Sequence, residues 1–397
     1  MDNIRIAVVG VGNMGGAHAV NISKGMVPGM ELAAICDINP DRIREMEKAL
    51  EKEVPFYTEF DRLLEDHIVD AILIATPHYL HPPMTIRALQ AGYHVLCEKP
   101  AGVDASVAEE MNRAAEHSDK VFGLMFNQRT NPLFQRLKDM VAAGQLGQIK
   151  HFTWIIHNWY RTQHYYDSGD WRGSWNGEGG GVLINQCPHN LDLWQWLIGM
   201  PDRLWANCAI GKYHDITVED DVTIFAEYDS GAVVSFITST GEYPGTNRLE
   251  IDGSLGKAVL EGGKLTFSKL ARDERIICRE SPESMPQEAY ETIVYEEEET
   301  IDGHLLILRN FTDHILLGTE LIAPGMEGIK ELTISNAAYL SAWKKEMVPI
   351  PLPAGEFTAA LKDMQEKEKA MHLEKQKAGG AEPIGSGAYQ DRWQVRW

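Results

Sequence analysis

Residues 4–15 read Ile-Arg-Ile-Ala-Val-Val-Gly-Val-Gly-Asn-Met-Gly, an apolar run that leads directly into a G-x-G-x-x-G pattern. A strand followed by this turn and then by a helix is the arrangement that binds a dinucleotide. Gly10 permits the tight turn, Gly12 lets the backbone approach a pyrophosphate, and Gly15 lets the helix pack closely on the strand. Backbone N–H groups at the helix start favour an anion, so the expected cofactor contacts of this turn are Gly10, Gly12, Asn13, Met14 and Gly15.

Asp37 ends the second apolar run of the chain. Its carboxylate can accept hydrogen bonds from both hydroxyls of an adenosine ribose and repels a 2′-phosphate, so the sequence favours NAD over NADP as the cofactor. Arg42 follows shortly afterwards and would weaken that preference, because a guanidinium accommodates a 2′-phosphate.

The first 125 residues alternate short apolar runs with helical patterns, which predicts a doubly wound parallel sheet in a domain over residues 1–125. The expected strands are residues 4–9, 31–36, 69–75, 94–97 and 121–126. The expected helices are residues 17–24, 42–51, 82–91 and 106–116. The fold class is therefore α/β in this part of the chain.

After about residue 126 the apolar runs become longer, alternate in polarity and are joined by Gly-rich turns, a pattern typical of an antiparallel sheet. We expect an α+β domain over residues 126–350 with a large, mostly antiparallel open sheet. Residues 351–397 form a C-terminal extension, whose charged helical stretch carries a thin apolar stripe of Phe357, Leu361, Met364 and Met371 before a Gly-rich link, Trp393 and Trp397. The sequence leaves open whether this extension folds over its own pocket or over that of a neighbouring subunit.

The chain is strongly acidic, with 37 Lys and Arg residues, 58 Asp and Glu residues and a formal net charge of −21. Such a surface repels nucleic-acid phosphates and anionic lipid, and no dense basic run is present, so neither nucleic acid nor a membrane is an expected partner. The five cysteines are far apart and form no C-x-x-C pair, which is typical of reduced thiols and not of a zinc site. The opening residues lack a signal-peptide pattern, so we expect a cytoplasmic protein without a bound metal.

Two further stretches resemble the signature motifs of the glucose–fructose oxidoreductase/inositol dehydrogenase (Gfo/Idh/MocA) family. The first is Ala-Thr-Pro-His-Tyr-Leu-His at residues 75–81 with Ala-Gly-Tyr-His-Val-Leu-Cys-Glu-Lys-Pro at residues 91–100; the second is Gly-Gly-Gly-Val-Leu-Ile-Asn-Gln-Cys-Pro-His-Asn-Leu-Asp at residues 179–192. The resemblance covers most of residues 1–345. It implies a Rossmann domain, a second domain whose open sheet often packs against another subunit, and NAD(P)-dependent oxidation or reduction of a sugar or cyclitol carbon. A homo-oligomer, dimer or tetramer, formed through that sheet is therefore expected.

By position in these motifs, Lys99 matches the family's catalytic lysine and His189 its catalytic histidine. Asn185 stands where the family usually has Asp, and an amide takes up no proton, so proton transfer falls on His189 or Lys99. Oxidation of a secondary alcohol requires a base for the hydroxyl proton, which suits an imidazole, and a cation that stabilises the oxygen, which suits an ammonium group. Asp192, one helical turn beyond His189, either orients the histidine or faces solvent.

Other expected cofactor contacts lie at the carboxyl ends of parallel strands, where ligands of open α/β sheets bind. Thr76, Pro77 and His81 follow one strand, and Glu98 and Lys99 follow another, so we assign them to the nicotinamide ribose and its surroundings. His81 is equally typical of a residue that begins a helix.

Residues 152–175 hold eight aromatic side chains, whereas aromatics make up 9% of the whole chain. Flat apolar faces together with His157, Arg161, His164 and Arg172 suit a pyranose ring, although the same aromatics equally suit the packing of a β-rich core. The two histidines lack a carboxylate spacing that completes a metal site. The expected substrate contacts are Lys99, Trp159, Tyr160, Arg161, Trp171, Arg172, Asn185 and His189.

The sequence as a whole favours an NAD-dependent oxidoreductase that acts on a ring secondary alcohol of a sugar, glycoside or cyclitol, with C3 of a hexopyranoside as one candidate position. Two alternatives stay open: a glycosidase that retains NAD and uses transient oxidation, and a non-catalytic NAD-binding sugar sensor. The presence of both Lys99 and His189 argues against the sensor.

Overall fold

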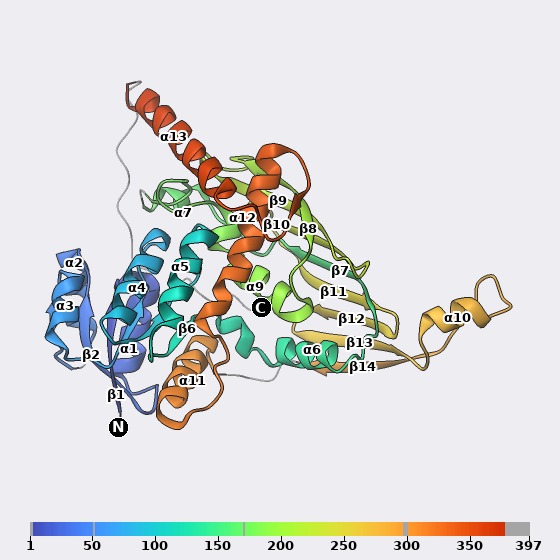
Figure 1. The fold of residues 1–397 in the computed structure, drawn as a ribbon, viewed down its shortest axis with the longest axis horizontal. Helices are drawn as coiled ribbons and strands as arrows, with labels where there is room; N and C mark the ends of the chain where they lie inside the picture. The colour runs from blue at the N-terminus through green and yellow to red at the C-terminus, as the bar shows by residue number, and fades with distance from the viewer. Residues whose placement is uncertain (1–2, 51, 170, 297–300, 378–397) are drawn as a thin grey trace. The chain divides into compact units, whose positions relative to one another are not determined.

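The computed structural model describes residues 3–50, 52–169, 171–296 and 301–377, which form two compact units (Figure 1). Among these residues, unit 1 comprises 3–130 and 301–332, and unit 2 comprises 131–296 and 333–377. The structure therefore differs from the expected contiguous domains, because residues 301–332, expected in the second domain, belong to unit 1.

Unit 1 is built on a six-stranded parallel sheet in the order β3-β2-β1-β4-β5-β6. The strands are β1 (Ile4–Val9), β2 (Met30–Cys36), β3 (Phe56–Tyr57), β4 (Ala71–Ile74), β5 (His94–Cys97) and β6 (Phe122–Leu124). The helices are α1 (Asn13–Ser23), α2 (Pro40–Ala49), α3 (Phe60–Asp66), η1 (His78–Leu80), α4 (His81–Gln90), α5 (Ala105–Glu116), η2 (Asn127–Thr130), α11 (Gly303–Leu317) and η3 (Gly325–Glu327). The predicted doubly wound sheet is confirmed, and its strand order reverses between β1 and β4, where open α/β sheets bind ligands.

Residues 301–332 return to unit 1 because they cover its last strand. Leu308 and Phe311 of α11 are fully buried, and Phe311 lies beside Gly123 of β6. The N–H of Leu124 donates to the carbonyl of Ala323 at 3.1 Å, so this segment also pairs with the edge of the sheet. Sequence periodicity gives no sign of this contact, since the two segments are far apart in the chain.

Unit 2 contains a nine-stranded sheet in the order β14-β13-β12-β11-β7-β10-β9-β8-β15. The strands are β7 (Ile149–Ile156), β8 (Arg203–Ile210), β9 (Glu219–Glu227), β10 (Val233–Ser239), β11 (Asn247–Gly253), β12 (Gly256–Glu261), β13 (Lys264–Leu270), β14 (Tyr290–Glu296) and β15 (Val348–Pro349). Neighbouring strands are antiparallel except β7 and β10, which are parallel. The predicted large, mostly antiparallel open sheet is confirmed.

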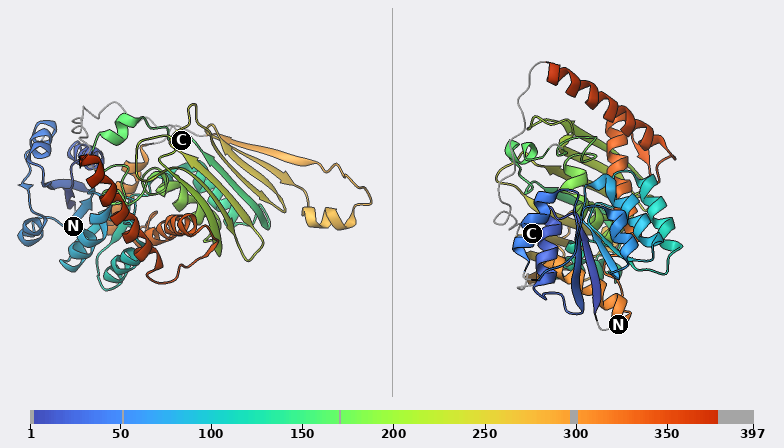
Figure 2. Two further views of the ribbon diagram at one scale, coloured as in Figure 1. Left: turned by 90° about the horizontal axis from the view of Figure 1, so that it is seen from above. Right: turned by 90° about the vertical axis from the view of Figure 1, so that its left-hand side faces the viewer.

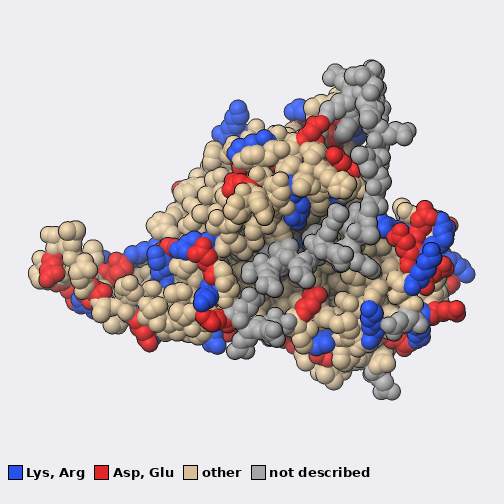
Figure 3. Space-filling model, turned by 180° about the vertical axis from the view of Figure 1, so that it is seen from behind, with Lys and Arg blue, Asp and Glu red and all other residues tan. Residues whose placement is uncertain are grey.

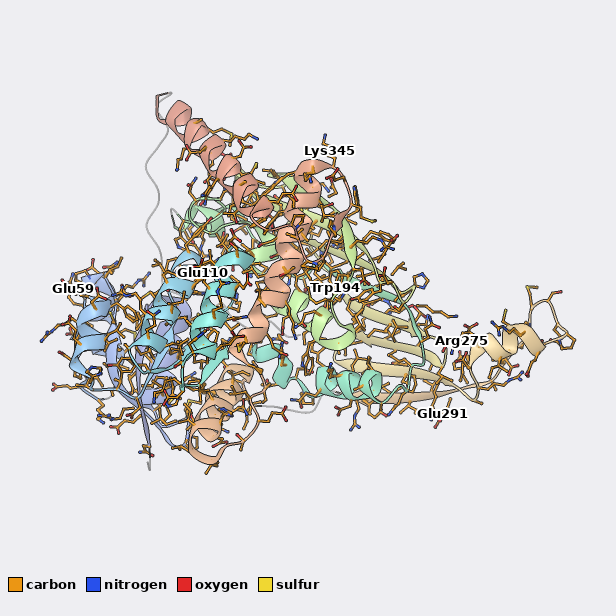
Figure 4. All side chains as sticks on the ribbon, in the orientation of Figure 1. Glu59, Glu110, Trp194, Arg275, Glu291 and Lys345 are labelled. Carbon is orange, nitrogen blue, oxygen red and sulfur yellow. The ribbon has the colours of Figure 1, made fainter. Side chains whose placement is uncertain are left out.

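The helices of unit 2 are α6 (Pro132–Ala142), α7 (Gln163–Asp167), α8 (Val182–Asn185), α9 (Pro188–Ile198), α10 (Glu274–Glu280), α13 (Glu356–Lys377) and the part of α12 (Gly328–Lys344) from Thr333 onward. Trp194 of α9, labelled in Figure 4, stacks on Phe152 of β7 and Phe236 of β10 at centroid distances of 6.2 and 5.9 Å, so α9 packs against one face of the sheet. The left view of Figure 2 shows α10, in gold, at the far end of the long β13–β14 extension.

Acidic and basic side chains are interspersed on the face of the molecule shown in Figure 3. In the described part of the chain, none of the helices has both the length and the apolar character that crossing a lipid bilayer requires. Of the predicted C-terminal stripe, Phe357 and Leu361 are buried and Met371 is exposed. Trp393 and Trp397 lie outside the described residues.

Candidate functional site

The glycine turn of unit 1 has a different steric demand at each glycine. Gly10 has φ +83°, and a Cβ on it would lie 2.6 Å from the carbonyl oxygen of Ala75. A Cβ on Gly15 would lie 1.8 Å from the carbonyl oxygen of Gly10, whereas a Cβ on Gly12 would meet no described atom within 4 Å. Gly10 and Gly15 are thus required by the fold, and Gly12 leaves open space beside the backbone.

This turn fits a dinucleotide. Helix α1 follows Gly12, and no described side chain caps its first N–H groups, so those of Asn13 and Met14 suit a pyrophosphate. Asp37 ends β2 at the same side of the sheet, where Oδ2 accepts from Val11 N at 2.8 Å and Oδ1 from Asn39 N at 2.8 Å. Each oxygen retains capacity for a further donor, as binding of a ribose diol requires.

His81 connects the ends of two neighbouring strands. It begins α4, it is buried, and its ring nitrogens lie 2.8 Å from the carbonyl oxygen of Pro100 and 2.7 Å from that of Thr76. Burial lowers the pKa of His81. The structure thus gives His81 the role of a helix-start residue that holds two loops together, and its contact with a cofactor stays a prediction, as do those of Thr76 and Pro77.

Glu98 makes a buried hydrogen bond with His18 that sequence reasoning missed. Its Oε1 lies 2.8 Å from Nε2 of His18 on α1, and its Oε2 accepts from the backbone N–H of Lys99 at 3.2 Å. Burial opposes the charged form, but the hydrogen bond and charge of His18, with the charges of His304 and Lys99, outweigh it and lower the pKa of Glu98 to about 2. An ionised Glu98 is therefore fixed at the end of β5, directly before Lys99.

In unit 2, a polar cluster surrounds the phenol of Tyr165. Its Oη accepts from Nη1 of Arg172 at 2.5 Å, from Nδ2 of Asn185 at 3.1 Å and from Nε2 of Gln186 at 3.2 Å. Asn185 Nδ2 also donates to the carboxylate of Glu178, which is 1% exposed. Burial raises the pKa of Tyr165, so its hydroxyl stays protonated near neutral pH. A carboxylate thus lies against Asn185, although position 185 itself carries an amide.

The guanidinium of Arg172 is fixed from several sides. Its Cζ lies 4.4 Å from the ring centroid of Tyr165 and 4.5 Å from that of Trp171, and Nη1 lies 3.8 Å from a carboxylate oxygen of Glu178. Arg161 approaches the Tyr165 ring at 5.1 Å. Stacking on aromatic faces leaves a planar cation preorganised for hydrogen bonding.

Four of the eight predicted substrate residues meet in this cluster, and the substrate contacts of Lys99 and His189 stay predictions. Arg161, Trp171, Arg172 and Asn185 are all members, and Arg161 also approaches the buried Trp159. Tyr160 lies apart, since it is 43% exposed and pairs with Tyr243 at 5.5 Å. Of the eight aromatics in residues 152–175, the core contains Phe152, Trp154, Trp159, Tyr166 and Trp175, so core packing accounts for these five.

His189 lies in the first turn of α9 and is buried. Asp192, one turn on, is 1% exposed and accepts from Nε2 of Gln195 at 2.9 Å, so the solvent-facing alternative for Asp192 was wrong. No group of three or more His, Cys, Asp and Glu side chains within residues 3–50, 52–169, 171–296 and 301–377 is arranged to hold a metal ion.

Glu219 fixes the glycine run before α8. Its carboxylate accepts from Gly181 N at 2.9 Å, from Leu183 N at 3.0 Å and from the hydroxyl of Tyr339 at 2.8 Å. A Cβ on Gly181 would lie 1.9 Å from the carbonyl oxygen of Glu219, so the chain requires glycine there. Burial raises the pKa of Glu219 to about 7. This buried carboxylate was missed because only the fold brings it to the motif.

Comparison with known proteins agrees with both units. Residues 4–126 match the family model described as "Oxidoreductase family, NAD-binding Rossmann fold", and residues 134–259 match the GFO/IDH/MocA C-terminal domain. A myo-inositol 2-dehydrogenase of Thermotoga maritima is 25% identical over 355 residues, which are 87% of this chain and 98% of that protein.

Solved structures show the same fold. The WlbA dehydrogenase from Bordetella pertussis, in complex with NADH and UDP-GlcNAcA, has a TM-score of 0.73 and 27% identity over 88% of this chain and 100% of that one. A levoglucosan dehydrogenase complex with NADH and L-sorbose has a TM-score of 0.75 and 20% identity over 89% and 100% of the two chains, a likeness in fold alone. The chain thus belongs to the GFO/IDH/MocA family of oxidoreductases, with its dinucleotide turn in unit 1 and its second motif in unit 2.

Proposed function

We propose that the protein is an NAD-dependent dehydrogenase that oxidises or forms a ring secondary alcohol of a sugar, glycoside or cyclitol. One observation carries this proposal: the backbone at Gly12 is open beside a helix start that no described side chain caps, which suits a dinucleotide. The same unit places Lys99 two residues after the end of β5. The relatives named above for myo-inositol and for UDP-GlcNAcA support a cyclic polyol or sugar as the substrate class.

Bound NAD supplies the hydride acceptor. His189 takes the hydroxyl proton in the oxidative direction and returns it in the other, a task for which imidazole basicity is suited. Lys99 stabilises the substrate oxygen as negative charge develops on it. Asn185 orients substrate hydroxyls and is itself held by hydrogen bonds to Glu178 and Tyr165. The carboxylate of Glu178 thus takes the place of the aspartate that the family usually has at position 185.

The polar cluster supports a ring substrate with several hydroxyls, and C3 of a hexopyranoside is the carbon that we propose. Arg172 carries N–H donors beyond the one that it gives to Tyr165, which match the hydroxyls of a ring edge, while Trp171 offers a flat apolar face. Asp37 supports NAD over NADP, because its carboxylate at the end of β2 repels a 2′-phosphate.

We also propose a homo-oligomer formed through the outer face of the nine-stranded sheet. Trp205 on β8 is 40% exposed and pairs across the strands with Phe225 on β9, which is half-buried. Exposed aromatics on a sheet face are typical of an interface. We propose the cytoplasm as the compartment, because the five cysteines are far apart in the sequence and form no C-x-x-C pair, as is typical of thiols in a reducing environment.

The decisive experiment is a screen of inositols, free hexoses, glycosides and nucleotide sugars with NAD and with NADP, followed by the absorbance of the reduced cofactor. On the best substrate, at saturating NAD, Lys99→Ala and His189→Ala should each lower kcat by about a hundredfold or more. Lys48→Ala and His151→Ala, which alter exposed residues of the same types, are the matched controls. Turnover within about threefold of the parent for either variant refutes the assignment.

The same screen separates the alternatives. Cleavage of a glycoside with no net release of NADH indicates a glycosidase that retains its cofactor. Binding of a sugar without turnover by the parent indicates a sensor.

A further inference from the structure

Helix α13 lies beyond the residues that match the family, 4–126 and 134–259, yet it carries one of the most deeply buried carboxylates of unit 2. Glu368 is 1% exposed, whereas its neighbours Lys367 and Lys369 are largely exposed and pair with Asp363 and Glu366 on the same helix. A charged side chain is buried only where it meets partners that replace water. The partners of Glu368 therefore indicate what the extension does.

Both oxygens of the Glu368 carboxylate accept hydrogen bonds from donors in two other segments. Its Oε1 accepts from the backbone N–H of Trp175 at 2.8 Å, and its Oε2 accepts from that of Asn176 at 2.8 Å. The side-chain amide of Asn176 donates to Oε2 at 2.5 Å, and the hydroxyl of Thr217 donates to Oε1. Charge-assisted bonds to consecutive backbone N–H groups fix both the position and the orientation of a loop.

An aromatic group joins the same elements. The ring of Trp175 lies 5.2 Å from that of Tyr339 and 5.3 Å from that of Trp343, both on α12. Phe357 at the start of α13 stacks on Trp343 at 5.8 Å. The indole N–H of Trp175 donates to the carbonyl of Thr217 at 2.7 Å. Helix α13 thus contacts Trp175 directly through Glu368, and Phe357 packs on Trp343, which in turn contacts Trp175.

The loop held by Glu368 carries the residues of the Tyr165 cluster at its two ends. Arg172 precedes Trp175 and Asn176, and Glu178 follows them. The loop closes on itself, since Gly173 N donates to Glu178 Oε2 at 2.7 Å and Gly177 N donates to the hydroxyl of Ser174 at 3.0 Å. A loop this short moves as one piece, so a change at Trp175 and Asn176 shifts both Arg172 and Glu178.

We propose that Glu368 is a positioning residue for substrate: through it, the C-terminal helix holds residues 171–178 so that Arg172 and Glu178 face Asn185 and Tyr165. This inference rests on the proposed function, because it assumes that the Tyr165 cluster binds the ring of the substrate. The C-terminal extension then supports the substrate site of its own chain and not that of a neighbouring subunit.

The test compares Glu368→Gln with Glu366→Gln in the full chain. Glu368→Gln keeps the volume of the side chain but replaces one carboxylate oxygen by an NH₂ group, which then faces the N–H donors of the loop. Glu366→Gln removes the charge of an exposed carboxylate on the same helix. In E368Q we expect amide hydrogen exchange at Trp175 and Asn176 to become at least tenfold faster and KM for the sugar to rise at least tenfold. We expect kcat to change less than KM and the Kd of NADH to stay within twofold; E366Q should match the parent throughout.

Each outcome bears on the proposal. Unchanged exchange in E368Q overturns the contact, and faster exchange with an unchanged KM overturns the positioning role. If E368Q does not fold, Glu368→Asp decides: it keeps the charge but shortens the side chain by one methylene, so its KM should exceed that of the parent, and a KM equal to that of the parent overturns the proposal. If no substrate is found, the proposed function fails, whereas exchange at Trp175 and Asn176 still decides whether Glu368 holds the loop.

Discussion

Adding a methyl group at one glycine of the turn should weaken cofactor binding alone, whereas adding one at another glycine should also lower the stability of the fold. Gly12 has φ −66°, which any residue adopts, and a Cβ on it meets nothing within 4 Å among the described atoms. Gly12→Ala should therefore change the free energy of unfolding by less than about 1 kcal/mol. The new methyl group occupies the space that we assign to the pyrophosphate, so the Kd of NADH should rise at least about tenfold.

Gly15→Ala should behave in the opposite way. The added Cβ would lie 1.8 Å from the carbonyl oxygen of Gly10 and 3.1 Å from Cβ of Ala75, so α1 must move away from β1. Overpacking of this kind costs about 3 kcal/mol, which lowers Tm by about 6–12 °C for a unit of this size. Cofactor binding weakens as well, because the whole turn is displaced.

The assay combines thermal unfolding by circular dichroism with titration of NADH by fluorescence. Gly16→Ala is the matched control, since its Cβ would make only ordinary van der Waals contacts, at 3.4 Å with Sδ of Met46 and at 3.6 Å with the carbonyl oxygen of Val11. It should keep the Kd of NADH and leave Tm equal or slightly higher. The reasoning is refuted if Gly12→Ala binds NADH within twofold of the parent, or if Gly15→Ala keeps the parent's Tm.

Two further predictions concern buried carboxylates. Asn185→Asp places a second carboxylate against Glu178 and should lower the free energy of unfolding by about 1–3 kcal/mol; adding Glu178→Gln should restore it, and a Tm for Asn185→Asp equal to the parent's contradicts this. Because the pKa of Glu98 is lowered from 4.5 to about 2, ionised Glu98 contributes about 3 kcal/mol above pH 4.5, which is lost as the pH falls toward 2. In urea titrations, the stability difference between the parent and Glu98→Gln should therefore shrink by at least about 1 kcal/mol from pH 7 to pH 3.5, and a constant difference would disprove the assignment.

The Rossmann part of the fold could be predicted because its signals are local. The apolar run of β1, the glycine turn and the start of α1 are contiguous, and each glycine has a steric reason that the structure reproduces. The strand β3 and the helix α3 were missed, since two and seven residues are too few to show a period.

The polar cluster could be predicted only in part. The density of aromatics marked residues 152–175, but which of them enter the core depends on strand register, which places Phe152 and Trp154 against α9 and α6. Glu178 and Glu368 look like ordinary charged residues in the sequence. Their roles come from contacts with Asn185 and with Trp175, the latter 193 residues away, and no local pattern records such a contact.

The return of residues 301–332 to unit 1 has a consequence for how the protein is made. A ribosome finishes β6 long before it makes Ala323 and Phe311, which pair with that edge strand and cover it. At about 5–20 residues per second, translation of the intervening segment takes roughly 10–40 s. During that interval the nascent dinucleotide fold presents a bare strand edge of the kind that recruits chaperones or aggregates, so a ribosomal pause within residues 131–300 should reduce the yield of active protein.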